Sequence, residues 1–91
     1  MSRKTEIQEA TDTVLEEKEA KDLILWNDDV HTFDFVTETL IEVCKHDPIQ
    51  AEQCTHLVHF KGKCAVKTGE MEKLMPYHKT LLGRGLTSSI E

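Results

Sequence analysis

The chain has 91 residues, a length that supports one small hydrophobic core but not two. Its 17 acidic residues outnumber its 11 basic residues, and the net charge of −6 disfavours nucleic acid as a ligand because phosphate groups would be repelled. The longest apolar run covers only residues 23–26, whereas a membrane span needs roughly 20 apolar residues.

The first residues of the chain lack the apolar segment of a secretory signal, so we expect a cytoplasmic protein. In that compartment the three cysteines, Cys44, Cys54 and Cys64, are expected to be reduced thiols. Residues 1–21 contain few large apolar side chains, and seven acidic residues face four basic ones through Asp22. We therefore interpret residues 1–21 as a flexible acidic N-terminal extension rather than a packed helix, followed by a core domain at residues 22–91.

The core begins with a predicted buried strand over residues 23–26, which ends at the turn-forming sequence Asn27-Asp28-Asp29. Thr32 is suited to cap a helix that runs to about His46, because the apolar side chains that follow it recur at close to the helical period.

A second helix is predicted from Pro48 to Lys61, with Asp47 as its N-cap and Gly62 as its end. Proline is tolerated at the first helical position because its missing N–H would have no helical partner there. The residues expected on its buried face are Ala51, Cys54, Leu57 and Val58. Residues 63–67 follow as a predicted strand, with Cys64 and Val66 on the same side.

The most regular helical pattern lies between residues 71 and 82. The residues at offsets of 0, 3, 4, 7, 10 and 11 are Met71, Leu74, Met75, His78, Leu81 and Leu82. Pro76 is expected to kink this helix or remove one backbone hydrogen bond. Gly83 and Gly85 are expected to end it, and residues 86–90 alternate as a last strand.

The element order of strand, helix, helix, strand, helix, strand predicts an α+β fold. We expect a small two-layer domain in which three helices cover one face of a three-stranded antiparallel sheet. The sequence contains no internal repeat or low-complexity segment that would suggest another architecture.

The Asn27-Asp28-Asp29 turn has two interpretations. Asn and Asp side chains often bond nearby backbone N–H groups, so the turn can be purely structural. Two carboxylates and an amide oxygen also offer several acceptors for a metal ion or an ammonium group. The glycine and distal glutamate of an EF-hand loop are missing, which argues against calcium.

His59, at the end of the second predicted helix, is either an ordinary surface side chain or a functional one. His56 and His59 with Cys54 and Cys64 could be counted as zinc ligands, but the chain has no Cys-x-x-Cys or His-Glu-x-x-His pattern. It also has no nucleophile elbow, Walker loop or dinucleotide fingerprint. We therefore expect neither an enzyme nor a protein that needs a metal or another cofactor.

Two motifs together resemble ClpS, the bacterial adaptor of the ClpAP protease. The first is Leu-Ile-Leu-Trp-Asn-Asp-Asp at residues 23–29, followed by Phe35-Val36, and the second is Leu-Val-His-Phe-Lys-Gly-Lys at residues 57–63. Asn27 and His59 stand 32 residues apart, as the corresponding residues do in that family. The resemblance covers about residues 21–91 and includes the predicted element order.

The resemblance implies an adaptor that binds substrates with a free N-terminal Leu, Phe, Tyr or Trp and delivers them to a Clp unfoldase. By motif, Asn27, Asp28 and His59 would hold the substrate α-amino group, and Asp29 would shape the pocket mouth. The residues that would line the slot for the first side chain are Leu25, Val36, Val58 and Leu86.

Three positions depart from the family pattern in ways that would reshape this pocket. His31 stands where threonine is usual, Phe33 replaces the methionine at the pocket gate, and Thr55 replaces a deeper methionine. We expect Phe33 to keep β-branched first residues excluded. His31 and His59 are expected to weaken binding in mild acid, because a protonated imidazole repels an ammonium group.

The expected partners are the N-terminal peptides of degradation substrates and a ClpA-type AAA+ unfoldase, with the chain itself a monomer. The segment between residues 64 and 86 is shorter than in common family members, near the part that docks on the unfoldase, and Glu70, Glu72 and Lys73 are the charges available there. The resemblance also implies that the unfoldase engages the N-terminal extension. The alternative is a protein-docking module of the same fold without N-degron recognition, as in the C-terminal domain of ribosomal protein L7/L12, which lacks the Asn-Asp-Asp turn with a downstream histidine.

Overall fold

The computed structural model describes residues 19–91 and contains three strands and three helices. Their order is β1 (Lys21–Trp26), α2 (Phe33–Cys44), α3 (Pro48–Lys61), β2 (Lys63–Gly69), α4 (Met71–Gly83) and β3 (Thr87–Ile90). The predicted α+β fold and element order are therefore confirmed. The predicted extension lies outside the described residues except for its last three, of which Lys21 already belongs to β1.

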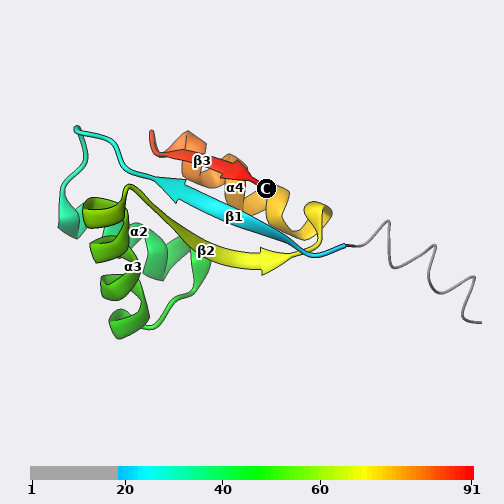
Figure 1. Cartoon of the computed structure of the whole chain (residues 1–91), viewed down its shortest axis with the longest axis horizontal. Coiled ribbons are helices and arrows are strands. Elements are labelled where there is room, and N and C mark those ends of the chain that lie inside the picture. The colour runs from blue at the N-terminus through cyan, green and yellow to red at the C-terminus, as the bar shows by residue number, and fades with distance from the viewer. Residues whose placement is uncertain (1–18) are drawn as a thin grey trace, which may run out of the picture.

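The three strands form one antiparallel sheet in the order β2-β1-β3, with β1 in the centre (Figure 1). Leu25 pairs with Cys64 of β2 and with Ser88 of β3, so the three buried side chains stand side by side on one face. The register with β2 shifts between Leu23 and Ile24. Leu23 pairs with Lys67 and Ile24 with Ala65, so the unpaired extra residue is Val66 of β2. Leu23, Ile24 and Leu25 are all buried.

The helix boundaries follow the capping residues of the sequence. Thr32 accepts a hydrogen bond from the Phe35 backbone N–H at 3.1 Å, and Asp47 accepts one from Gln50 at 2.8 Å. Gly62 ends α3 in the left-handed conformation, with φ of 92°. The prediction for α2 was two residues too long, because Lys45 turns left-handed at φ of 62° and releases His46 into the core, where its ring bonds the Val66 carbonyl at 2.7 Å.

The buried face of α3 differs from the predicted one. Ala51, Thr55 and Val58 are buried, while Leu57 is 42% exposed. A buried threonine is possible here because the Thr55 hydroxyl donates to the Ala51 carbonyl and accepts from the Thr37 hydroxyl, both at 2.8 Å. With Ala51, Thr55 and Val58 facing inward, residues 56, 59 and 60 lie on the exposed face of α3.

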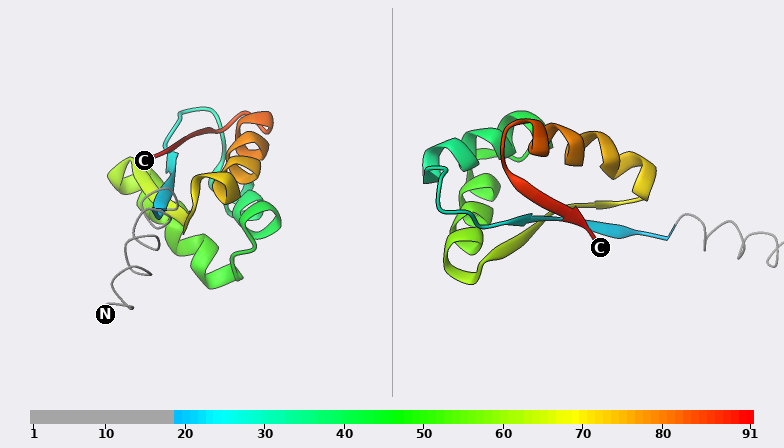
Figure 2. Two further views of the ribbon diagram at one scale, coloured as in Figure 1. Left: turned by 90° about the vertical axis from the view of Figure 1, so that its right-hand side faces the viewer. Right: turned by 90° about the horizontal axis from the view of Figure 1, so that it is seen from above.

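Helix α4 continues through Pro76, and of its predicted stripe Leu74 and Leu81 are fully buried while Met71 and Leu82 are exposed. Gly83 is its last residue rather than its stop, and β3 begins at Thr87. Figure 2 shows the helices lying against the sheet. Buried side chains of the strands and the helices pack together as one core. No helix within residues 19–91 is long and apolar enough to cross a membrane.

Candidate functional site

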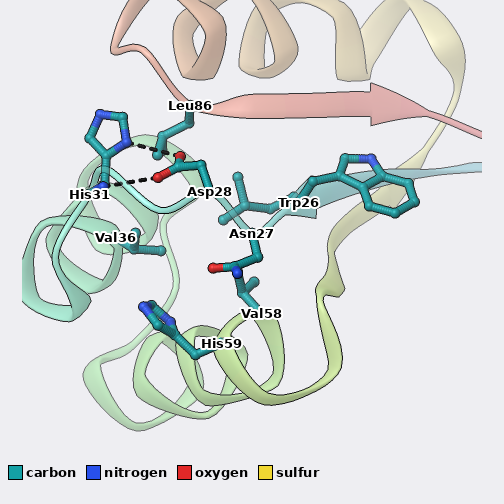
Figure 3. Close-up of a pocket in the computed structure, with 9 residues that line it drawn as sticks. Trp26, Asn27, Asp28, His31, Val36, Val58, His59 and Leu86 are labelled. Atoms are coloured by element: carbon teal, nitrogen blue, oxygen red, sulfur yellow. Dashed lines mark hydrogen bonds and ion pairs between the residues drawn. The ribbon is translucent and has the colours of Figure 1, made fainter.

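A pocket lies at the C-terminal end of β1, where the start of α2, the end of α3 and the residue before β3 converge (Figure 3). Its empty volume is about 210 Å³ including the open mouth, and it is too narrow to hold a water-sized sphere. The residues that line it are Leu25, Trp26, Asn27, Asp28, His31, Val36, Val58, His59 and Leu86. The pocket therefore unites the two sequence motifs across the fold.

Asp28 is held in place by three hydrogen bonds. One carboxylate oxygen accepts from the backbone N–H groups of Val30 and His31, and the other pairs with the His31 ring Nδ1, all at 2.9 Å. Partial burial opposes ionisation, but these bonds outweigh it and hold the pKa of Asp28 below its ordinary value of 3.8. The carboxylate is thus ionised at neutral pH and can accept further hydrogen bonds.

His31 connects this turn to the rest of the site. Its ring stacks on Phe35 with 4.9 Å between centroids, and its Nε2 would lie only 3.3 Å from a methyl group added at Gly85. The ring is therefore fixed between α2 and the loop before β3 while its Nδ1 pairs with Asp28. Asp28 and His31 stand three residues apart in the sequence, but this contact between their side chains was not predicted.

His59 and Asn27 stand on the opposite side of the mouth. The His59 Nδ1 lies 3.0 Å from the Thr55 carbonyl, which can only accept, so Nδ1 carries the proton and the neutral ring keeps an acceptor lone pair on Nε2. The Asn27 backbone N–H donates to the Gly62 carbonyl at 2.9 Å, which ties the end of β1 to the end of α3. In Figure 3 the Asn27 amide points into the space between Asp28, Val36 and His59.

The inner wall of the pocket is apolar. Leu25, Val36, Val58 and Leu86 are each at least 95% buried, and all four were predicted for this wall. Trp26 also lines the pocket and was not predicted. Its indole N–H donates to the Ser89 hydroxyl at 2.8 Å, and the Lys63 ammonium lies 5.1 Å from its ring. Both contacts join strands that are distant in sequence, so sequence spacing gave no sign of them.

Three predicted residues do not line the pocket. Asp29 is exposed on the turn, and Thr55 is buried beneath His59, where its carbonyl holds the imidazole. Phe33 lies outside the mouth against His59, with 5.5 Å between ring centroids.

The thiols and imidazoles do not assemble a metal site or an activated nucleophile. Within residues 19–91, no three His, Cys, Asp or Glu side chains are grouped as metal ligands. The Cys54 and Cys64 sulfurs lie 3.1 Å apart as free thiols. Burial raises the pKa of Cys44 to about 11, and burial with a hydrogen bond to Cys54 raises that of Cys64 to about 12. Both therefore stay protonated at neutral pH and are poor nucleophiles.

The residues at the mouth and in the wall suit a cation that carries an apolar group. Three acceptors stand at the mouth: the Asn27 amide oxygen, the Asp28 carboxylate and the His59 Nε2. Directly behind them is a narrow apolar wall. A primary ammonium attached to a hydrophobic side chain matches both halves of this pocket.

Known proteins resemble this chain in sequence and in fold. A family model described as "ATP-dependent Clp protease adaptor protein ClpS" matches residues 16–88. The ATP-dependent Clp protease adapter protein ClpS of Thermosynechococcus vestitus is 35% identical over 66 residues, covering 71% of this chain and 70% of that protein. The structure of Agrobacterium tumefaciens ClpS2 bound to L-phenylalaninamide has a TM-score of 0.69 at 22% identity, covering 82% of this chain and 96% of that chain.

Proposed function

The chain belongs to the ClpS family of ATP-dependent Clp protease adaptors, and from this premise we propose that it binds the free N-terminal residue of substrates that begin with Leu, Phe, Tyr or Trp. It then delivers them to a Clp AAA+ unfoldase without catalysing a reaction itself. The observation that carries this proposal is the pocket, which places three hydrogen-bond acceptors at its mouth and an apolar wall behind them.

In this proposal the substrate α-ammonium binds at Asn27, Asp28 and His59. An ammonium group donates three hydrogen bonds, and each residue offers one acceptor of suitable type. Each charge-assisted bond contributes roughly 1.5–3 kcal/mol. Acetylation of the terminus removes the charge and leaves a single N–H, so acetylated substrates are expected to be rejected.

The first side chain enters between Leu25, Val36, Val58 and Leu86, and burial of one Leu or Phe contributes roughly 1.5–3 kcal/mol. Because the pocket is narrow, its walls must spread on binding, and this cost lowers the net affinity. An affinity on the order of micromolar, suited to transient delivery, is expected. The structural neighbour ClpS2 was solved with L-phenylalaninamide, a compound that combines a free amine with an aromatic side chain, and this supports the proposal.

Fluorescence anisotropy tests the ligand class, using peptides that differ only at residue one, with the terminus free or acetylated. We expect Phe-, Leu-, Tyr- and Trp-starting peptides to bind, and acetylation, Asp28→Ala or His59→Ala to weaken binding at least about tenfold. Asp29→Ala is the matched control, because Asp29 neighbours Asp28 but is exposed and outside the pocket. A chain that binds free and acetylated peptides equally would overturn the proposal.

For delivery, we propose that the unfoldase docks at the end of the molecule opposite the pocket. β1 starts and β2 ends at that end, where Lys21 pairs with Gly69, and α4 begins beside them (Figure 1). Glu70, Glu72 and Lys73 lie there, so an unfoldase could dock without covering the pocket. Lys73→Glu should slow degradation of a Phe-starting reporter by a ClpA-type unfoldase and its peptidase, with peptide affinity unchanged. Unchanged degradation would remove this surface from the proposal.

A further inference from the structure

Two cysteine side chains meet where α3 packs against β2. The Cys54 Sγ on α3 and the Cys64 Sγ on β2 lie 3.1 Å apart, and both are free thiols. Cys64 is a member of the core, and Cys54 packs against that core from the helix. The packing of the helix on the strand therefore holds the two sulfurs in contact before any bond forms between them.

The three cysteines of the chain differ in their access to solvent. Cys54 is half-buried, whereas Cys64 is only 8% exposed and Cys44 only 1% exposed. Burial also raises the pKa of both Cys44 and Cys64, which keeps them in the less reactive thiol form. A dissolved oxidant therefore reaches Cys54 first, and Cys64 is the thiol in place to react with the oxidised sulfur.

We propose that Cys54 and Cys64 form a reversible disulfide when the protein meets hydrogen peroxide, and that this bond restrains the pocket. In the first step the Cys54 Sγ attacks one peroxide oxygen and the O–O bond breaks, which gives a sulfenic acid and one water. In the second step the Cys64 Sγ attacks the Cys54 sulfur, the S–O bond breaks and the S–S bond forms. The sulfenic hydroxyl leaves with the Cys64 proton as a second water, so two electrons pass from the thiols to the peroxide.

The proposed bond closes a loop that contains part of the pocket. Val58 and His59, which line the pocket, stand between the two cysteines in the sequence. Leu25, which lines the pocket from β1, pairs with Cys64 in the sheet. The pocket is too narrow for a water-sized sphere, so its walls must spread to admit a side chain. A bond from α3 to β2 opposes that movement, so oxidation is expected to weaken peptide binding, a consequence that rests on the proposed function.

Digestion with trypsin tests the bond itself, because cleavage after lysine places the three cysteines on separate peptides, residues 22–45, 46–61 and 64–67. The folded chain is treated with hydrogen peroxide, and the remaining thiols are capped before digestion. We expect peptides 46–61 and 64–67 to be joined, peptide 22–45 to carry a capped thiol, and dithiothreitol to separate the joined pair. Cys54→Ser should abolish the linkage, and Cys44→Ala is the matched control that should retain it. Separate peptides from the oxidised chain, or linkage only after unfolding in urea, would overturn the inference.

Anisotropy with a free Phe-starting peptide tests the effect of the bond on the pocket. Oxidation should weaken binding by about threefold or more, and dithiothreitol should restore it. Cys54→Ser should bind equally with and without peroxide, which separates the disulfide from oxidation elsewhere in the chain. If the reduced chain does not bind the peptide, the proposed function fails, and the trypsin digest alone decides whether the disulfide forms. If the linked and reduced chains bind equally, redox control of the pocket is overturned.

Discussion

The Asp28 side chain belongs both to the turn after β1 and to the lining of the pocket. Its carboxylate closes the turn by accepting from two backbone N–H groups, and it also faces the pocket as one of three acceptors. The ring of His31 locks this orientation from the side. Because the turn is fixed before any ligand arrives, the proposed binding of an ammonium group would require little reorganisation of the carboxylate.

The lowered pKa of Asp28 means that the folded state favours its ionised form, so its stabilisation is present above pH 3.8 and is lost as the pH falls through the folded value. Asp28→Ala should lower the free energy of unfolding by about 1–2 kcal/mol at pH 7. In urea unfolding the gap between the two proteins should narrow at pH 3. An equal gap at both pH values would contradict this role.

Two histidines, His31 and His59, line the pocket, so we expect peptide binding to weaken in mild acid. Protonation of His59 converts its Nε2 from an acceptor into a donor, and protonation of His31 offsets the negative charge of Asp28. Affinity for a Phe-starting peptide should fall about tenfold or more between pH 8 and pH 5.5. In the His31→Gln variant, only the loss of peptide affinity that is due to protonation of His59 should remain. Titrations at the two pH values that give the same affinity would exclude this mechanism.

Among the elements, the caps were predictable and the inward face of α3 was not. Thr32, Asp47, Pro48 and Gly62 act locally, and each took the role that its residue type favours. The face of α3 depends on which polar groups find partners in three dimensions. Thr55 is buried because Thr37 and Ala51 satisfy its hydroxyl, and hydrophobic periodicity contains no information about that.

Two glycines at the end of α4 should respond oppositely to substitution. Gly85 has φ of 86°, and an added methyl group would press on His31 at 3.3 Å, whereas Gly83 is helical with open space around it. Gly85→Ala should destabilise the fold by about 1 kcal/mol or more and weaken peptide binding by moving His31. Gly83→Ala should be neutral or stabilising by up to about 1 kcal/mol. Urea unfolding with peptide titration would reveal this difference, and equal effects would argue against the contact.

At the scale of the whole molecule, most of the pocket residues could be predicted from the sequence, but the side-chain contacts between the elements that carry them could not. Asn27, Asp28 and His59 could be chosen because two motifs, at a matching separation, resemble the ClpS family, and the same resemblance implied Val36, Val58 and Leu86. The place of Trp26 in the wall and that of Phe33 outside the mouth depend on side-chain contacts between elements. Such contacts are formed by the folded arrangement as a whole, so residue type alone does not predict them.

The shape of the pocket predicts discrimination between isomeric first residues. The pocket is narrow, and its inner wall includes the stiff β-branched side chains of Val36 and Val58, so a substrate branched at Cβ should clash with this wall. Leu-starting peptides are expected to bind at least about fivefold more tightly than Ile-starting peptides of the same remaining sequence, given that one misplaced methyl group costs roughly 1–3 kcal/mol. Competition anisotropy measures the ratio, and equal affinities would refute the exclusion.

Recognition of a free amine together with an apolar side chain is the central claim, and isothermal titration calorimetry of the intact chain with L-phenylalaninamide tests it most directly. N-acetyl-L-phenylalaninamide and glycinamide are the matched ligands, since each removes one half of the recognition. We expect saturable binding of one equivalent of L-phenylalaninamide, with heats for the other two ligands indistinguishable from dilution. Equal binding of the acetylated ligand, or no binding of L-phenylalaninamide at millimolar concentration, would contradict the proposed function.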